Sequence, residues 1–154
     1  MSEPISISEF RRQSGSVFSE VIQGHRPRVI RRGRDDVGLL VGHDEILAML
    51  ADRSFHPQVV GGDGSVSIWL PEFEIYGQGD TYAEAKEDLV GEARVYIKEY
   101  LANVDQYRRA PNRSGHFAYV IKAQLADIRG ELEQLIFPGP PDLATLRTQA
   151  ATTA

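Results

Sequence analysis

The chain contains no cysteine among its 154 residues. Disulfide bonds and thiolate metal sites are therefore excluded, and a reducing compartment, the cytoplasm, is the expected location. No apolar run approaches the roughly 18 residues of a membrane-spanning helix, and the N-terminus lacks the basic and then apolar pattern of a secretion signal. We therefore expect a cytoplasmic protein that has no membrane partner.

The net charge of −5 is unevenly distributed along the chain. Residues 1–34 hold seven arginines against three glutamates, a net charge of +4. Residues 54–105 hold three basic residues against ten acidic ones, a net charge of −7. This split predicts a basic surface that faces a polyanion and an acidic part that faces a different partner.

The first 24 residues predict a short strand followed by a helix. Residues 5–8 alternate apolar and polar side chains, and the hydroxyl of Ser8 can cap the following helix by accepting a backbone N–H. The helix is expected to end at Gly24, in the usual C′ position. Its predicted apolar face consists of Val17, Phe18, Val21 and Ile22.

A hairpin and a second helix are predicted next. Residues 28–31 and 37–41 have the composition of two strands, and residues 33–36 form the turn between them. Residues 43–53 predict a helix whose inward side chains are Ile46, Leu47 and Leu50.

This order of strand, helix, hairpin and helix resembles the DNA-binding half of the Phd/YefM (prevent-host-death) antitoxin family. The matching positions are Ile5, Ile7, Ser8, Glu9, Arg11, Gly24, Val29, Ile30, Arg32 and Leu39 to Val41. The resemblance implies that residues 1–53 are the DNA-binding and dimerisation module of a type II antitoxin. Such a protein neutralises a cognate toxin, typically a RelE-like ribonuclease or another translation inhibitor, and represses its own operon.

The resemblance also implies which residues contact DNA and which join two copies. Arginine presents a planar fork of donors that suits phosphates and guanine edges. The expected DNA-binding residues are Ser8, Arg11, Arg12, Arg31, Arg32 and Arg34, although composition alone favours a solvated charged face. A module of about 50 residues buries apolar side chains poorly by itself. The expected dimerisation residues are therefore Val29, Ile30, Leu39, Leu40, Leu47 and Leu50.

The middle of the chain predicts a small sheet followed by a long helix. Residues 55–60 are expected to form a connection, residues 61–64 a glycine-rich turn, and residues 65–71 and 72–77 two extended segments. Thr81 and Glu84 match a capping box at the start of the helix. The predicted buried face of this helix is Ala85, Leu89, Ala93, Tyr96, Ile97, Tyr100 and Leu101.

Residues 58–102 resemble the HicB-type antitoxin domain, a sheet-and-helix unit similar to a reduced ribonuclease H fold. The matching residues are Val66 to Glu72, Gly79 to Thr81, Glu84, Ala85 and the helix up to Leu101. The chain departs from the usual HicB pattern because its interval between proline and aspartate is one residue shorter. It also lacks the common Pro-Gly-Cys piece.

An enzymatic reading of the middle segment is the weaker alternative. Ribonuclease H chemistry needs clustered carboxylates that hold two metal ions, and the candidates are Asp63, Glu72, Glu74 and Asp80. Each of them has a sufficient structural role in a turn or a cap. The four histidines, His25, His43, His56 and His116, show no metal-ligand spacing. The glycine clusters at 61–64 and 77–79 lack the lysine of a phosphate loop. We therefore expect no catalysis, no metal and no cofactor. Trp69 and Phe73 are expected in the core.

The C-terminal part predicts a polar linker, a helix and a tail. Residues 103–114 are expected to form the linker, and residues 138–154 a mobile tail. Within residues 115–137, apolar side chains recur at heptad spacing, interrupted by Gly130. This seam, which begins at Ala118, either packs within the chain or binds the toxin. Its candidate toxin-binding residues are Ile121, Leu125, Ile128, Leu132 and Leu135.

The sequence as a whole predicts an α+β protein that acts as an antitoxin and forms a homodimer or a higher oligomer. Its expected partners are a cognate toxin and operator DNA. One rival is a transcriptional regulator or an assembly scaffold that works without a toxin. A metal-dependent nuclease built on the middle segment is the other rival.

Overall fold

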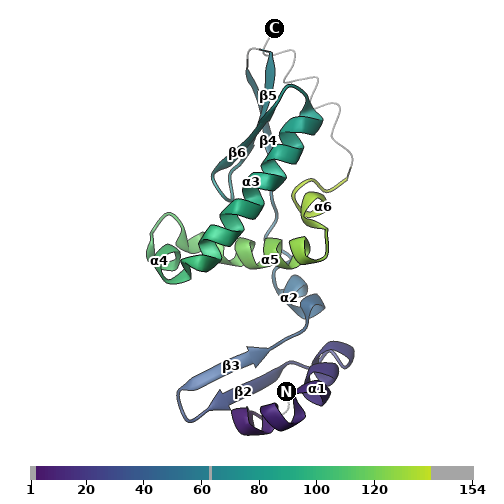
Figure 1. Cartoon of the computed structure of the whole chain (residues 1–154), viewed down its shortest axis with the longest axis vertical. Coiled ribbons are helices and arrows are strands. Elements are labelled where there is room, and N and C mark those ends of the chain that lie inside the picture. The colour runs from purple at the N-terminus through teal and green to yellow at the C-terminus, as the bar shows by residue number, and fades with distance from the viewer. Residues whose placement is uncertain (1–2, 63, 140–154) are drawn as a thin grey trace. The chain divides into compact units, whose positions relative to one another are not determined.

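The computed structural model describes residues 3–62 and 64–139 of the chain. The chain divides into two compact units, residues 1–52 and residues 53–154, called unit 1 and unit 2 here. Each unit combines helices with a three-stranded sheet (Figure 1). The predicted α+β fold class is therefore confirmed. No helix within residues 3–62 and 64–139 is long and apolar enough to cross a membrane.

Unit 1 contains a mixed sheet with strand order β1-β2-β3 and two helices. Strand β1 is parallel to β2, and β2 pairs antiparallel with β3, so that Val29 lies opposite Leu39. The elements are β1 (Ile5–Ser6), α1 (Ile7–Gln23), β2 (Arg28–Arg32), β3 (Asp36–Leu40) and α2 (His43–Met49). The predicted order of elements is therefore present.

Both ends of α1 differ from the sequence prediction. Ser6 caps the helix, because its Oγ accepts the N–H of Glu9 at 3.1 Å, and the prediction of Ser8 as the cap is wrong. Ser8 lies inside the first turn instead. At the other end, Gly24 donates its N–H to the carbonyl of Glu20 with an ordinary φ of −87°. The left-handed residue is His25, with φ 53°. The chain therefore leaves the helix one residue later than the glycine predicts.

Unit 2 contains an antiparallel sheet with strand order β4-β5-β6 and the long helix α3. Helix α3 packs on the sheet, and Gly77 permits the close approach, since a Cβ there would lie 2.4 Å from the carbonyl oxygen of Ala85. The elements are β4 (Gln58–Gly62), β5 (Ser65–Leu70), β6 (Ile75–Gly79), α3 (Tyr82–Ala102), α4 (Val104–Arg109), η1 (Ser114–His116), α5 (Phe117–Ile128) and α6 (Leu132–Ile136).

Three predictions about unit 2 are wrong. Residues 58–62, expected as a connection and part of a turn, form strand β4 because they pair with β5 along their whole length. Residues 103–114, expected as a linker, contain helix α4. The expected single helix over residues 115–137 is broken between α5 and α6, where Gly130 adopts φ 72°.

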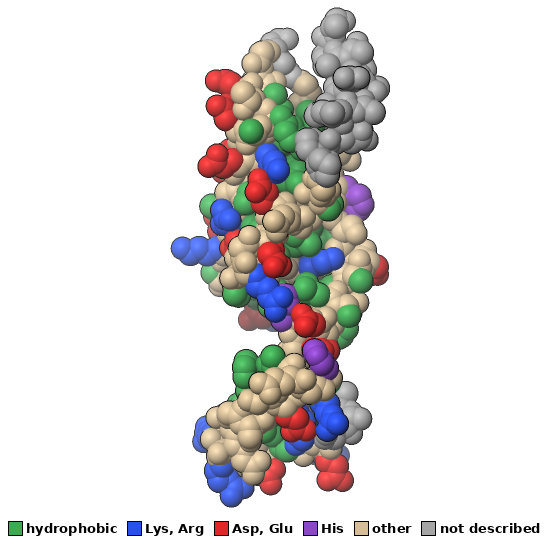
Figure 2. Space-filling model, turned by 90° about the vertical axis from the view of Figure 1, so that its right-hand side faces the viewer, with side chains coloured by type: hydrophobic (Ala, Val, Ile, Leu, Met, Phe, Trp, Pro, Cys, Tyr) green, Lys and Arg blue, Asp and Glu red, His purple; other side chains and the backbone are tan. Residues whose placement is uncertain are grey.

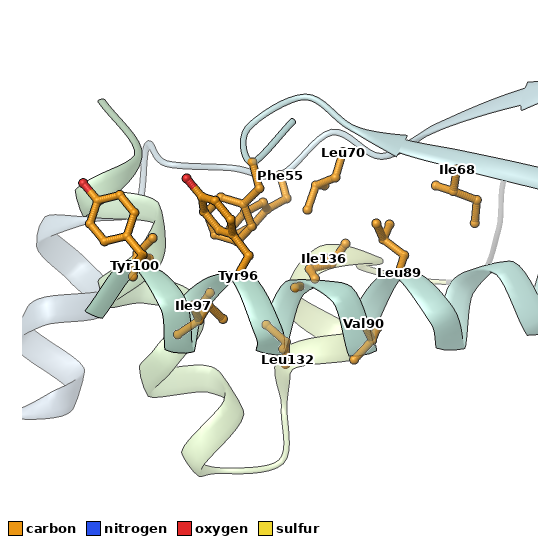
Figure 3. Close-up of a cluster of buried hydrophobic side chains, with 14 of the residues drawn as sticks. Phe55, Ile68, Leu70, Leu89, Val90, Tyr96, Ile97, Tyr100, Leu132 and Ile136 are labelled. Atoms are coloured by element: carbon orange, nitrogen blue, oxygen red, sulfur yellow. The ribbon is translucent and has the colours of Figure 1, made fainter. Parts of the chain in front are cut away.

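The core of unit 2 lies around α3. The capping box is confirmed, since Thr81 Oγ1 accepts the N–H of Glu84, whose carboxylate accepts the N–H of Thr81. The predicted buried face of α3 is also confirmed, apart from Leu101, which is half-buried. Figure 3 shows Ile68 and Leu70 of β5 on the side of α3 where Leu89 points. Phe73 is fully buried, as expected, whereas Trp69 is half-buried beside Tyr76 at a ring distance of 4.5 Å.

Candidate nucleic-acid interface

All six candidate DNA-binding residues are exposed on unit 1. Ser8, Arg11 and Arg12 lie in the first two turns of α1, Arg31 and Arg32 end β2, and Arg34 lies in the turn before β3. Strand β1 is followed directly by α1, which places the first three residues at the start of the helix. The turn between β2 and β3 contains Gly33 with φ 64°, and this turn places the other three. Figure 2 shows blue arginine side chains on the surface of unit 1.

The arginines differ in what their side chains contact. Arg32 donates from Nε and Nη2 to one carboxylate oxygen of Asp36, at 2.9 and 2.6 Å. Arg31 donates from Nη2 to the carbonyl of Arg34 at 3.5 Å. Within residues 3–62 and 64–139, the guanidinium groups of Arg11, Arg12 and Arg34 have no ion pair or hydrogen bond. These three cations are available to an external anion.

An open groove of about 660 Å³ lies between the start of α1 and the hairpin. Its floor is apolar, and Arg31 and Arg32 contribute to its lining. The other lining residues are Ile7, Phe10, Ile30, Asp35, Asp36, Val37, Gly38, Leu39 and Leu40. The groove thus brings three of the candidate dimerisation residues, Ile30, Leu39 and Leu40, beside two of the candidate DNA-binding arginines.

Unit 1 exposes more apolar surface than the sequence indicated. Leu39 is 51% exposed, and its neighbour Val37, which the prediction omitted, is 60% exposed. The remaining candidate dimerisation residues, Val29, Ile30, Leu40, Leu47 and Leu50, are half-buried. The predicted inward face of α1 is only partly correct, because Val17 and Val21 are buried while Phe18 and Ile22 are exposed. The helical periodicity of the sequence could not distinguish the buried pair from the exposed pair, because all four residues fall at helical spacing.

The candidate carboxylates of unit 2 do not come together. Asp63 lies outside the described residues. Glu72 binds the exposed His56 at 2.7 Å, and Asp80 donates its backbone N–H to Glu84. Within residues 3–62 and 64–139, no three histidine, aspartate or glutamate side chains form a group that could hold a metal ion.

His116, Tyr96 and Glu74 form a polar cluster at the edge of the core. The Tyr96 hydroxyl and His116 Nδ1 lie 2.5 Å apart, and His116 Nε2 lies 3.9 Å from a carboxylate oxygen of Glu74. Burial lowers the pKa of His116 below its ordinary value, and burial raises the pKa of Tyr96. Glu74 adopts a left-handed φ of 55° at this position. The cluster joins the β5–β6 turn to η1.

Two arginines of unit 2, which were not among the candidate DNA-binding residues, pack on aromatic rings. The guanidinium of Arg108 lies 4.8 Å from the ring centroid of Phe117, and that of Arg113 lies 5.3 Å from Tyr96. The side-chain hydrogen bond that Arg113 donates to the Tyr96 oxygen raises the pKa of Arg113. These cations cover aromatic rings of their own unit, so they differ from the uncommitted arginines of α1.

The candidate toxin-binding residues divide by burial. Leu132 is 1% exposed, so its side chain belongs to the core of unit 2. Ile128, at the end of α5, is 72% exposed. Ile121, Leu125 and Leu135 are half-buried. The buried residues of α5 are Val120, Lys122, Ala123 and Ala126, so the heptad pattern does not describe the packed face.

Comparison with known proteins connects this fold to toxin–antitoxin systems. A crystal structure of the antitoxin part of a proposed toxin/antitoxin system from Syntrophomonas wolfei subsp. wolfei matches with a TM-score of 0.73 and 24% identity. The match covers 88% of this chain and 97% of that chain, and it shows a shared fold. No curated protein matches the chain. The model of the PHD_like family, described as the antitoxin of toxin–antitoxin systems of the RelE/RelB type, matches residues 1–137. Since this match spans most of the sequence, the protein belongs to the PHD_like family of antitoxins.

Proposed function

We propose that this antitoxin binds and neutralises a cognate toxin and represses its own operon as a dimer bound to a palindromic operator. The observation that carries the proposal is the arrangement in unit 1. Arg31 and Arg32 line an exposed, largely apolar groove, and the exposed Arg11, Arg12 and Arg34 have uncommitted guanidinium groups. We assign to unit 1 the role of a Phd/YefM-like DNA-binding and dimerisation module, ending near residue 53. Residues 58–102 would be a HicB-like module, and the protein would act by binding, without catalysis.

Operator binding is supported by the exposure of the six candidate residues. Arg11 and Arg12 of α1 have uncommitted guanidinium groups, which suits base edges or phosphates. Arg32 already has a carboxylate partner, which suits a contact to the backbone of DNA, where a phosphate replaces Asp36. Ser8, Arg31 and Arg34 would complete the surface. A dimer would present two such surfaces to the half-sites of a palindrome.

Dimerisation through unit 1 is supported by its incomplete burial. Leu39 and Val37 of β3 expose half or more of their side chains. A second copy would cover the groove and bring Val29, Ile30, Leu39, Leu40, Leu47 and Leu50 into a shared apolar interface, as an isologous contact requires.

Gel-shift titration at two salt concentrations tests operator binding. The double variant Arg11→Ala, Arg32→Ala should lose affinity for the operator, by about 1–3 kcal/mol if Arg11 reads a base. Arg32→Ala alone should weaken all sequences alike and lower the salt slope by about one if it contacts a phosphate. Arg109→Ala, an exposed arginine of α4, is the matched control. Unchanged affinity in the double variant would overturn this part of the proposal.

Toxin binding rests on the family and on the exposed end of α5. We propose that Ile128 is the main apolar contact, with Ile121, Leu125 and Leu135 around it and Leu132 holding α6 in the core. The toxin would be a RelE-like ribonuclease or another inhibitor of translation. Co-expression with the neighbouring reading frame, followed by a pull-down and a growth-rescue assay, tests this assignment.

The decisive comparison in that assay is between two exposed apolar residues. Ile128→Asp should abolish neutralisation and leave operator binding and thermal stability unchanged. Val95→Asp, at an exposed position of α3, should leave all three unchanged. Full neutralisation by Ile128→Asp would exclude this contact. Absence of any toxin in the pull-down, together with intact operator binding, would favour a transcriptional regulator that works without a toxin.

A further inference from the structure

The two edges of the sheet in unit 2 differ in their hydrogen bonding. At the β6 edge, Asp88 Oδ2 accepts the N–H of Gln78 at 2.8 Å. Just beyond the strand, Glu84 Oε2 accepts the N–H of Asp80 at 2.8 Å. Both carboxylates come from α3, so side chains of the helix occupy outward donors at this edge. Charged side chains at a sheet edge also oppose the addition of another strand.

The alternation of the antiparallel ladder determines which backbone groups of β4 point outward. Because Gln78 directs its N–H to Asp88, its pair with Ser67 of β5 is a non-hydrogen-bonded pair. Ser67 therefore directs its own N–H and C=O toward β4, where it lies opposite Val60. The pairing of β4 with β5 is continuous and contains no bulge. The two residues that flank Val60 must consequently direct their backbone groups away from the sheet.

These flanking residues, Val59 and Gly61, present two N–H and two C=O groups at the outer edge of β4. None of the four groups has a hydrogen-bond partner among the described residues. The strand, Gln-Val-Val-Gly-Gly, carries no charge and no proline, the usual devices that protect an edge. An edge of this kind is a template on which another strand can pair.

The outer face of the same sheet carries no charged side chain in its described part, although a quarter of the chain's residues are charged. The strand registers place on this face Gln58, Val60, Ser65, Ser67, Trp69, Tyr76 and Gln78. Trp69 and Tyr76 are in ring contact there, and both Tyr76 and Val60 are exposed. A strand added to β4 would extend an apolar and uncharged surface.

We propose that β4 pairs antiparallel with β4 of a second copy of the chain, about a two-fold axis at Val60. In that register Val59 of each copy lies opposite Gly61 of the other, so the unused donors and acceptors of both edges satisfy one another. Val60 of each copy meets Val60 of the other on the outer face, and no like charges come together. The two sheets become one continuous sheet of β6-β5-β4-β4-β5-β6.

The strand is self-complementary, which is why a second copy is the favoured occupant. An isologous contact requires that the same patch match itself. The β4 edge meets that requirement because the outward groups of Val59 in one copy can pair with those of Gly61 in the other, and the strand carries no charge that would repel its copy. This association uses unit 2 alone and does not depend on operator binding, toxin binding or the dimerisation of unit 1. If unit 1 also pairs, each chain has two separate surfaces for self-association.

Cross-linking through a single introduced cysteine tests the register. The protein has no cysteine, so Val60→Cys provides one thiol per chain. Opposed residues of a non-hydrogen-bonded pair have Cα atoms about 4.5 Å apart, within the range that a disulfide bridges. The full-length Val60→Cys protein should therefore form a disulfide-linked dimer under mild oxidation. Gln78→Cys, on the same face but at the blocked edge, should remain largely monomeric on a non-reducing gel. Equal rates for the two variants would overturn the proposal.

A charge-swap experiment identifies the occupant. Tagged Val60→Lys protein should recover several-fold more untagged Val60→Glu protein than untagged Val60→Lys protein, because only a two-fold contact places residue 60 opposite itself. Association through unit 1 contributes equally to both mixtures. Equal recovery would reject pairing at Val60. Cross-linking of Val60→Cys to a co-expressed toxin, and not to itself, would assign the edge to the toxin and reject the second copy.

Discussion

Units 1 and 2 are built from similar elements but differ in how far they bury their apolar side chains. In unit 2 a single cluster around α3 includes fully buried large residues such as Tyr100 and Phe73. In the described part of unit 1 the buried apolar side chains are Val17 and Val21, while Phe18, Val37 and Leu39 are exposed. Unit 2 is therefore stabilised by contacts among its own residues, whereas unit 1 leaves apolar side chains exposed. Incomplete burial in a small unit is itself evidence of a binding role.

The arginines of the two units differ in whether their guanidinium groups contact other residues of the same unit. Arg108 and Arg113 of unit 2 lie over aromatic rings of that unit. Arg11 and Arg12 of unit 1 have no such commitment among the described residues. The number of arginines in a segment therefore says less about nucleic-acid binding than the contacts of their guanidinium groups. Net charge selects unit 1 as the expected DNA-binding part, whereas the contacts of the guanidinium groups separate the uncommitted arginines from those that pack on aromatic rings.

The same substitution in the two units should show the difference in burial most strongly. Phe73 is 0% exposed and Phe18 is 54% exposed. Phe73→Ala should lower the free energy of unfolding by about 3–5 kcal/mol, because it removes a ring from a closed core. Phe18→Ala should change it by about 0.5 kcal/mol or less when the protein is dilute. Denaturant titration of both variants provides the measurement. A large loss from Phe18→Ala at low concentration would mean that unit 1 buries this ring in the monomer.

The parts of the fold that could be predicted from the sequence are those fixed by local rules. The capping box at Thr81 and the buried face of α3 depend on spacing within one helix. Both are confirmed, with Leu101 as the one predicted residue of the face that is only half-buried. The predicted N-cap of α1, Ser8, lies two residues after the observed cap, Ser6. Both serines are good capping residues, and the pairing of Ile5 with Ile30, which is distant in sequence, decides between them.

The parts that could not be predicted depend on contacts distant in sequence. The sequence of β4 is typical of a glycine-rich connection, and it forms a strand because it pairs with β5. Helix α4 is short and polar. It is stabilised by contacts with neighbouring helices, because Arg108 lies over the ring of Phe117 and Tyr107 stacks on Tyr100. In α5, the heptad spacing predicted an inward position for Ile128, but this residue is exposed. The reason is that α5 packs against α3 of the same chain, so its buried face is not the face that a coiled coil would bury.

Association of unit 1 should be sensitive to a charge placed in its groove. Leu39→Asp puts a carboxylate on a surface that the proposed dimer would desolvate, so it should weaken dimerisation by about 2 kcal/mol or more. Val95→Asp on unit 2 is the matched control, since Leu39 and Val95 are both 51% exposed. Light scattering of the full-length proteins across a dilution series measures the change. An unchanged mass profile for Leu39→Asp would place the dimer interface elsewhere.

Unit 2 should respond to acid through His116, whose imidazole lies between Tyr96 and Glu74 at the edge of the core. Burial lowers the pKa of His116 in the folded protein, so the unfolded chain binds its proton more readily below pH about 6.5. The contribution of His116 to stability is therefore retained above that pH and is lost as the pH falls toward the folded pKa.

The variant His116→Gln isolates this contribution. It should lower stability at neutral pH by about 1 kcal/mol, through loss of the Tyr96 hydrogen bond, and it should flatten the acid dependence of the midpoint. His56→Gln, at an exposed histidine, is the control for a general effect of removing an imidazole. Thermal unfolding measured between about pH 5 and pH 8, the range in which histidine changes its charge, gives the comparison. Parallel profiles for His116→Gln and the original protein would exclude His116 as the acid-sensitive group.

The smallest expected effect concerns the Arg32–Asp36 pair, whose side chains are 75% and 61% exposed. An exposed ion pair contributes about 0–1 kcal/mol, so Asp36→Asn should scarcely change the free energy of unfolding. Its effect on operator binding should be opposite to that of an arginine deletion. The change removes a carboxylate that competes with phosphate for Arg32, so affinity at low salt should rise and the salt slope should steepen by up to about one. Asp105→Asn in α4 removes the same charge from unit 2 and should leave binding unchanged. Equal affinity of Asp36→Asn and the original protein at both salt concentrations would mean that Arg32 stays with its neighbour and that only the uncommitted arginines of α1 meet the DNA.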